Sequence, residues 1–416
     1  MQPPIAAEAE AFEVDGLKVI FRHNPAHEVV AARFYVRGGA LNLQTESAGA
    51  ELLYAQAARR GTRRYPKHEL NAVLARLGVD LGASLGEDYT VFNLRCLQRH
   101  FATAWDVFTD VIADPTLEAS DVEVVRRQAL LEIRQRRDDP DVWLGELARR
   151  QCYAGHPYAP HPAGTEASMA GLEAEGLRAH MRRHLTRANA ILVVVGDVRR
   201  QDLETRVAET LARLPRGDGH APSPPPLRYD SGSLYVEARD LPTNYVLGHF
   251  AAPALRQSDH PPALIGLSVL RDRLFEEVRT KRNLSYAPSA SLGQRAANLG
   301  SVYVTATDPQ AALQVMRHEM RRMHDEPLDV KELQDKIRVF VTRYHLQNET
   351  NFAQAGFLAA HELLGEGWEK SRDFVPRLQA VTPEDVQRVA RRILRHVQWV
   401  YLGDPRHATQ EPLLDP

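Results

Sequence analysis

Short apolar runs bounded by turn residues alternate along this chain with longer stretches that favour helix. Asp15-Gly16, with apolar residues on both sides, is typical of the tight turn of a β-hairpin. Strands are predicted at residues 12–14, 17–21, 29–36, 80–85, 90–97, 190–195 and 397–402, and helices at 46–60, from 120 onward, at 176–183 and at 386–393. Because the strands come in hairpins between long helices, we expect an α+β fold with helices packed on antiparallel sheets.

Two of the predicted helices carry start signals. Ser120 followed by Glu123 is the pattern of a capping box, in which the two side chains satisfy the first backbone N–H groups. Thr382 precedes Pro383, which suits the first position of a helix.

The chain also contains a weak internal repeat. The strand at 190–195 leads into Gly196-Asp197, and the strand at 397–402 leads into Gly403-Asp404, which lies 207 residues later. At the same offset, Ser84-Leu85 falls on Ser291-Leu292. A proline-rich stretch at 217–228 separates the halves. We therefore expect two homologous domains, at 1–216 and 229–416, each an antiparallel sheet with helices packed on one face.

Composition narrows the classes of function. The 416 residues include 44% hydrophobic and 25% charged residues, which is usual for globular proteins, and the net charge of −2 gives no support for a nucleic-acid partner. No run of 18 apolar residues predicts a membrane span. The N-terminal residues lack the pattern of a signal peptide, so a cytoplasmic location is expected, with a periplasmic one as the alternative if a leader has been removed. Cys96 and Cys152 are expected to be reduced and buried.

A helical segment in the first half resembles the zinc-binding helix of a peptidase family. Residues 47–62 read SAGAELLYAQAARRGT. This segment resembles the pitrilysin and mitochondrial-processing-peptidase family, in which a helix at this place carries His-x-x-Glu-His and ends in Gly-Thr. In that family the two imidazoles hold zinc and the glutamate is the general base.

The family's zinc-binding side chains are missing from this chain. Anchored on Gly61-Thr62, the motif positions fall on Leu52, Ala55 and Gln56. Leucine and alanine have no donor atom, and a glutamine amide is a poor zinc ligand. Neither His-x-x-Glu-His nor His-Glu-x-x-His occurs elsewhere in the sequence. The resemblance therefore implies that this chain holds no zinc.

Other possible ligands do not restore the site. The family's third ligand is a glutamate 76 residues after the second histidine, and this count from Gln56 reaches Glu132. One carboxylate cannot hold catalytic zinc, and we expect Glu132 to pair with a nearby arginine on its helix. His156 and His161 lie in a proline-rich loop with no third ligand nearby, so we expect no metal there either.

A second family signature is kept. Residues 273–286 read RLFEEVRTKRNLSY and resemble the family's second-domain signature, which carries an arginine and a tyrosine seven residues apart. Arg279 and Tyr286 match these two positions. In the family the arginine binds a substrate carbonyl and the tyrosine donates to the tetrahedral oxyanion. The chain departs from the family just before the signature, where residues 267–270 replace a frequent Gly-Gly pair.

Together these features imply the non-catalytic, substrate-binding subunit of a two-chain zinc peptidase. The partners implied are a homologous zinc-bearing subunit and a peptide substrate, with a homodimer as the state of the isolated chain, which is expected to be inactive. Two alternatives stay open. One is a structural protein like the core subunits of the respiratory bc1 complex, and the other is an independent peptidase with unorthodox zinc ligands.

Overall fold

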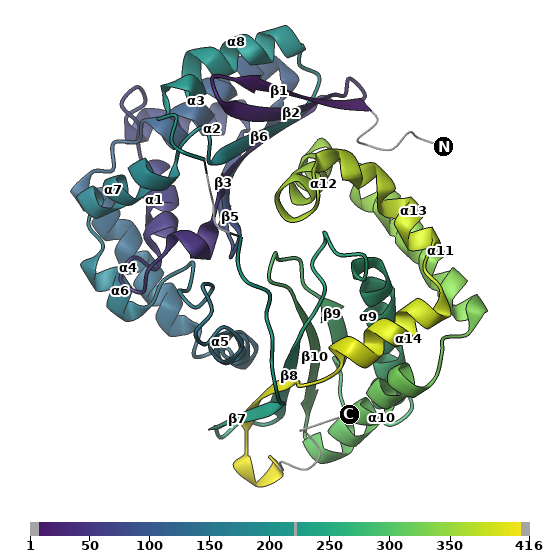
Figure 1. The fold of residues 1–416 in the computed structure, drawn as a ribbon. Coiled ribbons are helices and arrows are strands. Elements are labelled where there is room, and N and C mark those ends of the chain that lie inside the picture. The colour runs from purple at the N-terminus through teal and green to yellow at the C-terminus, as the bar shows by residue number, and fades with distance from the viewer. Residues whose placement is uncertain (1–7, 220–222, 409–416) are drawn as a thin grey trace. The chain divides into compact units, whose positions relative to one another are not determined.

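The computed structural model describes residues 8–219 and 223–408, which form two compact units. The first unit comprises Met1–Arg134, Pro160–Ser223 and His345–Arg372, and the second comprises Gln135–Ala159, Pro224–Tyr344 and Asp373–Pro416. Each unit contains one β-sheet and its own apolar core (Figure 1).

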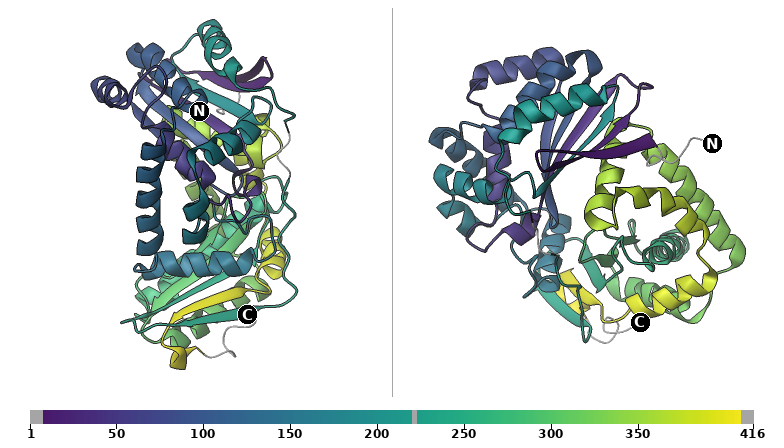
Figure 2. Two further views of the ribbon diagram at one scale, coloured as in Figure 1. Left: turned by 90° about the vertical axis from the view of Figure 1, so that its left-hand side faces the viewer. Right: turned by 45° about the horizontal axis from the view of Figure 1, so that its top comes forward.

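The first unit is built on a six-stranded sheet with the order β1-β2-β6-β3-β5-β4. The right view of Figure 2 shows its strands fanned out beside the helices of the unit. The strands are β1 (Ala9–Val14), β2 (Leu17–His23), β3 (Val29–Arg37), β4 (Asp80–Leu85), β5 (Tyr89–Leu97) and β6 (Ala190–Gly196). β1 and β2 form the predicted hairpin, in which Asp15 and Gly16 both have positive φ, at 50° and 87°.

Alternation along the strands decides which face of this sheet is covered by the unit's own helices. Leu17, Val19 and Phe21 point to one face and lie in the apolar core, while Lys18 and Arg22 point to the other. The helices that the first half of the sequence contributes to this unit are α1 (Ala50–Ala58), α2 (Lys67–Leu77), α3 (Phe101–Ala113), α4 (Ala119–Gln135), α6 (Glu166–Gly171), α7 (Ala174–His184) and α8 (Arg200–Thr210).

The second unit is built on a five-stranded sheet with the order β7-β11-β8-β10-β9. Its strands are β7 (Ser233–Ala238), β8 (Asn244–Ala251), β9 (Ser289–Leu292), β10 (Leu299–Ala306) and β11 (Gln398–Gly403). Its helices include α9 (His260–Leu274), α10 (Pro309–Asp325), α13 (Phe374–Gln379) and α14 (Pro383–Ile393), and α11 (Val330–Gln347) runs on from α10. Val246, Val302 and Trp399 of this sheet are buried and belong to the apolar core of the unit.

The two sheets repeat one topology, which confirms the predicted α+β fold with two homologous domains. The order β2-β6-β3-β5-β4 in the first sheet corresponds strand by strand to β7-β11-β8-β10-β9 in the second. Both sheets are mixed rather than purely antiparallel, because β2 pairs with β6 and β7 pairs with β11 in parallel.

A helix also covers the second face of each sheet, so the expectation of helices on one face is corrected. In the first unit α12 (Asn351–Leu364) contacts β3 and β6, and its Glu362 accepts a hydrogen bond from Lys18 at 2.8 Å. In the second unit α5 (Pro140–Cys152) packs Trp143 and Leu147 against Val400 of β11. Each of these helices comes from the opposite half of the sequence. The predicted domains, 1–216 and 229–416, correspond to the two repeated halves of the sequence. Their boundary at 217–228 stays a prediction.

The predicted helix starts are confirmed in one case and shifted in the other. Thr382 caps α14 in a capping box with Asp385, and Pro383 occupies the first helical position. α4 begins at Ala119, so Ser120 lies inside the helix rather than capping it. α1 is shorter than the predicted 46–60 because it begins only after Gly49, which has φ of 89°.

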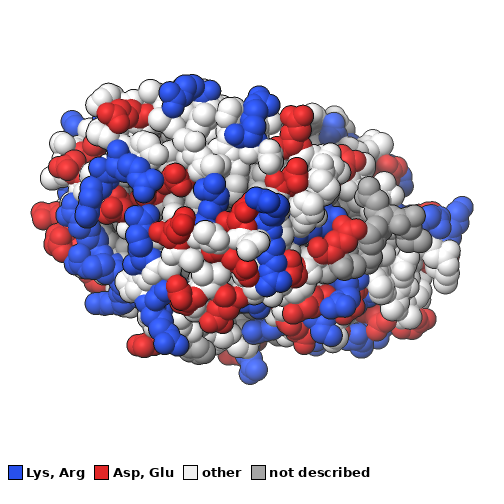
Figure 3. All heavy atoms as spheres, turned by 90° about the horizontal axis from the view of Figure 1, so that it is seen from above, with Lys and Arg blue, Asp and Glu red and all other residues white. Residues whose placement is uncertain are grey.

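The described part of the chain contains no helix that is both long and apolar enough to cross a bilayer. Charged side chains of both signs are spread over the face shown in Figure 3. Cys96 and Cys152 are buried free thiols, as expected, and burial raises the pKa of each to about 12. Both thiols are therefore protonated at neutral pH and unreactive.

Candidate functional site

Arg279 and Tyr286 lie against each other in the second unit. The Arg279 guanidinium carbon is 4.1 Å from the centroid of the Tyr286 ring and 4.7 Å from that of Phe275, so the cation contacts two aromatic rings. The Tyr286 side chain is 77% exposed. The sequence predicted the pair, and the structure adds Phe275 as its third member.

The local backbone explains this arrangement. α9 widens into a π-helical segment, Phe275–Thr280, a form often found at functional sites. Leu274 and Val278 are fully buried on one side of this segment, which leaves Phe275 and Arg279 on the other. Positive φ at Asn283 then turns the chain back, with the Leu284 N–H donating to the Val278 carbonyl at 2.9 Å. The next two residues bring Tyr286 to the guanidinium.

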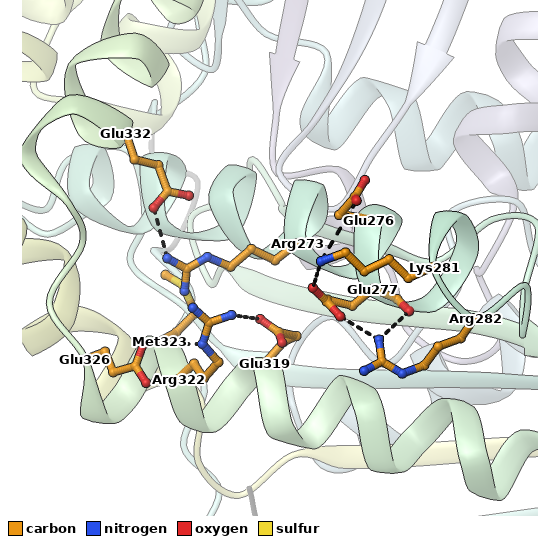
Figure 4. A network of polar contacts seen from close by, with 10 residues as sticks. All are labelled: Arg273, Glu276, Glu277, Lys281, Arg282, Glu319, Arg322, Met323, Glu326 and Glu332. Carbon is orange, nitrogen blue, oxygen red and sulfur yellow. Dashed lines mark hydrogen bonds and ion pairs between the residues drawn. The ribbon is translucent and has the colours of Figure 1, made fainter.

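The cationic side chains near Arg279 in the sequence form ion pairs with carboxylates, but the Arg279 guanidinium does not. Figure 4 shows Lys281 and Arg282 both bound to Glu277, at 2.7 and 2.5 Å. These two hydrogen bonds lower the pKa of Glu277 to about 2. Arg273 pairs with Glu332 at 2.9 Å. Within the described residues the Arg279 guanidinium has no ion pair or hydrogen bond, and neither has the Tyr286 hydroxyl. Five N–H donors and one O–H donor are thus available to an external acceptor.

The positions that the resemblance assigns to the zinc motif, Leu52, Ala55 and Gln56, lie on α1 in the first unit. Ala55 is 2% exposed, while Leu52 and Gln56 are half-buried, and Leu52 packs at the edge of the apolar core. Zinc needs three or four nitrogen, sulfur or carboxylate donors, and these three residues supply only an amide. In residues 8–219 and 223–408 no three His, Cys, Asp or Glu side chains are placed to hold a metal ion. The residues present do not fit zinc.

Glu132 does not have the partner expected from the sequence. It is exposed on α4, and the arginines nearest to it along the helix bind other carboxylates, Arg134 with Glu166 and Arg127 with Glu123. Among the described residues Glu132 makes no ion pair, so the expected pairing with an arginine is wrong. The reason is geometric, because those arginines find carboxylates on α6 and one turn earlier on α4.

His156 and His161 have structural roles. The His156 ring contacts two backbone groups, since its Nε2 lies 3.0 Å from the Pro225 carbonyl oxygen and its Nδ1 accepts from the Tyr158 N–H at 3.1 Å. The His161 Nδ1 accepts from the Ala163 N–H at 3.0 Å. These contacts order the proline-rich loop and leave no ligand pair for a metal.

A buried polar cluster behind α1 was missed from the sequence. Glu51, 2% exposed, accepts hydrogen bonds from Asn42 at 3.1 Å and from Thr90, and the His180 Nε2 lies 3.5 Å from it. His184 stacks 4.7 Å from His180, and its pKa is lowered to about 4, first by burial and then by the neighbouring His180 charge. The spacing of His180 and His184 on one helix was the available signal. Through Glu51, these contacts attach α1 to the neighbouring parts of the chain.

Known protein families match both halves of the chain. Residues 18–166 match the family described as insulinase (peptidase family M16), and residues 171–340 match the peptidase M16 inactive domain. An uncharacterized zinc protease of Streptomyces coelicolor is 24% identical over 353 residues, which cover 80% of this chain and 76% of that protein.

Solved structures share the fold. The crystal structure of a peptidase M16 inactive domain from Pseudomonas fluorescens superposes with a TM-score of 0.88 at 20% identity, over 95% of this chain and 98% of that one. A weaker relative is mouse mitochondrial cytochrome b-c1 complex subunit 1, which is 20% identical over 249 residues, or 59% of this chain and 52% of the relative.

Proposed function

Because this chain belongs to the M16 (insulinase/pitrilysin) peptidase family, we propose that it is the non-catalytic, substrate-binding subunit of a heterodimeric zinc metallopeptidase. A homologous partner subunit holds the zinc. This chain supplies Arg279 and Tyr286 to the shared peptide-binding site.

The observation that carries this proposal is the contrast between the two parts of the family's site. The positions for zinc and general base hold Leu52, Ala55 and Gln56, which can neither bind the metal nor take a proton from water. Arg279, in contrast, is free of carboxylate partners and stacked on Tyr286. Because the half-buried guanidinium and the exposed phenol have no hydrogen-bond partner among the described residues, both can bind an acceptor from outside.

The chemistry follows from the donors. The Arg279 guanidinium donates to a carbonyl oxygen of the bound peptide and fixes its position. The Tyr286 hydroxyl donates to the oxygen that becomes negative when the carbonyl is attacked, and this stabilises the transition state more than the substrate. Phe275 gives the guanidinium a second cation–π contact, which helps to hold it beside Tyr286.

The test is a reconstitution of peptidase activity. The chain is mixed with a zinc-bearing M16 protein from the same cell, and hydrolysis of a fluorogenic peptide is followed for wild type and for Tyr286→Phe. Removing one oxyanion donor lowers kcat by about 100-fold or more. The matched control is Tyr235→Phe, which removes the hydroxyl of another exposed tyrosine, one on β7.

The role given to Tyr286 is refuted if Tyr286→Phe supports wild-type turnover in the mixture. It is refuted equally if Tyr235→Phe loses as much activity, since the loss would then not be local to the pair.

A second candidate function rests on the similarity to mouse cytochrome b-c1 complex subunit 1. In this case the chain is a structural subunit of a larger assembly and promotes no proteolysis. Purification of the chain with its native partners separates the two functions, because the first predicts a zinc-bearing M16 protein with peptidase activity in the complex, and the second predicts an assembly without such activity.

A further inference from the structure

A groove of about 550 Å³ opens at one end of the sheet in the second unit, away from the Arg279–Tyr286 pair in sequence. Four separate stretches of chain form it, namely the residues that lead into β7, the segment after β8, the segment before β10, and the turn between α14 and β11. The lining residues are Pro226 to Asp230, Ala251 to Pro253, Arg256, Gln257, Ala296 to Asn298, Arg392, Ile393, Arg395 and His396.

The lining is strongly basic. The lining contains Arg228, Arg256, Arg392 and Arg395 and one carboxylate, Asp230, while Asp259 outside the lining pairs with Arg392. This differs from the mixture of signs on the face in Figure 3. Arg228 and Arg395 are exposed, and within the described residues neither forms an ion pair. Cations gathered in a concave surface repel one another, and a bound anion relieves this cost.

The structure holds these cations in place. Arg392 is bound to Asp259 at 2.5 Å, which fixes it at the groove wall. Arg395 and His396 occupy the tip of the turn because Leu394 and Val397 on either side are 1% and 2% exposed and anchor it in the core. His396 adopts φ of 52°, a left-handed conformation that is uncommon for a residue other than glycine and often found at binding sites.

The floor of the groove is apolar and small-sided, with Ala251, Ala252, Pro253, Ala296 and Ala297. The single aromatic residue of the lining is Tyr229, whose hydroxyl donates to the Cys152 carbonyl at 3.0 Å. Single-stranded nucleic acids need several aromatic faces for base stacking, so this floor does not suit them. It does suit an extended backbone with short side chains.

We propose that this groove binds an acidic peptide segment of another protein. Its volume is in the usual range of ligand sites, about 300–1,000 Å³. Guanidinium groups bind carboxylates through paired hydrogen bonds. Because the arginines come from three stretches of chain, they match several separated carboxylates better than one compact phosphate. The inference is independent of the peptidase role, since none of these residues belongs to the Arg279–Tyr286 pair.

The test measures fluorescence anisotropy of fluorescein-labelled hexaglutamate titrated with the full chain. The double variant Arg228→Ala/Arg395→Ala weakens binding by about tenfold or more, because two charge-assisted contacts are lost. The variant Arg228→Lys/Arg395→Lys keeps the charge but loses the paired geometry, and weakens binding by a smaller factor. The matched control is Arg338→Ala/Arg343→Ala, which removes two exposed arginines of α11 outside the groove and leaves binding unchanged.

Three results overturn the proposal. The first is that hexaglutamate does not bind, and the second is that the α11 control loses as much affinity as the groove variant. The third is that an oligothymidylate or inorganic phosphate displaces the peptide more effectively than sodium chloride of equal ionic strength, which would make the site one for phosphate. Thermal unfolding of each variant, with a midpoint equal to that of wild type, shows that the fold is kept.

Discussion

Arg279 differs from the neighbouring cations in what it contacts. Lys281 and Arg282 are bound to Glu277, whereas Arg279 contacts two aromatic rings and no carboxylate. The sequence predicted the identity of the pair because its spacing belongs to a known signature. It could not predict Phe275 or the free guanidinium, because both depend on a π-helical turn and on which carboxylate each neighbouring cation reaches.

The opposite case is the cluster around Glu51, which sequence reasoning missed. A buried carboxylate is recognised by its surroundings, and Asn42, Thr90 and His180 reach Glu51 from three other parts of the chain. Spacing along the sequence carries no sign of such contacts. The prediction that Leu52 and Ala55 replace zinc-site residues rests on the local sequence alone and needs no tertiary information.

The half-buried His184 of this cluster predicts a fold that is less stable in acid. Burial and the His180 charge lower the pKa of His184 from 6.5 to about 4. The unfolded chain therefore binds more protons than the folded chain between these values, so the stability due to a neutral His184 is complete above about pH 6.5 and declines as the pH falls toward 4. The midpoint temperature of thermal unfolding should therefore decrease as the pH is lowered from 6.5 to 4.

The matched variant is His184→Gln, which cannot take up a proton. Its midpoint should fall less steeply than that of wild type, with a remaining slope from His249, whose pKa burial also lowers to about 4. Identical profiles for wild type and His184→Gln would remove His184 from the account.

At the scale of elements, the strands of the first sheet and β11 were predicted, whereas β7 to β10 and the packing of two helices were not. Every predicted strand is present because apolar and turn residues mark strands locally. α12 and α5 were not assigned to a sheet face, since their partners lie in the other half of the sequence. Asn351 is one residue that attaches α12 to the first sheet. Its side-chain oxygen accepts from the Asn24 amide at 2.7 Å, and its side-chain nitrogen donates to the Val29 carbonyl at 2.6 Å.

Loss of this amide should loosen α12. Asn351→Ala leaves the buried amide of Asn24 without its acceptor, which costs about 1–3 kcal/mol. Local opening becomes easier by that amount, so amide hydrogen exchange on α12 should speed up by about 10- to 100-fold. Glu349→Ala, in the exposed segment just before the helix, is the control and should leave exchange unchanged. Equal protection in wild type and Asn351→Ala would show that other contacts hold the helix.

At the scale of the whole molecule, the chain repeats one topology and uses its halves differently. The sheets share the same order of five strands, yet the first unit carries α1, with Leu52, Ala55 and Gln56, and the second carries the Arg279–Tyr286 pair. The repeat was visible in the sequence only as two short matches at one offset, because the core side chains have diverged while the strand order has not.

The central claim is that this chain holds no catalytic zinc, and zinc stoichiometry tests it most directly. The purified chain is equilibrated with excess zinc, passed through a desalting column and analysed by mass spectrometry for metal per chain. The residues at 52, 55 and 56 predict far less than about one zinc per chain. About one zinc per chain, lost on Glu132→Gln, would contradict the claim and make this chain a peptidase with unorthodox ligands.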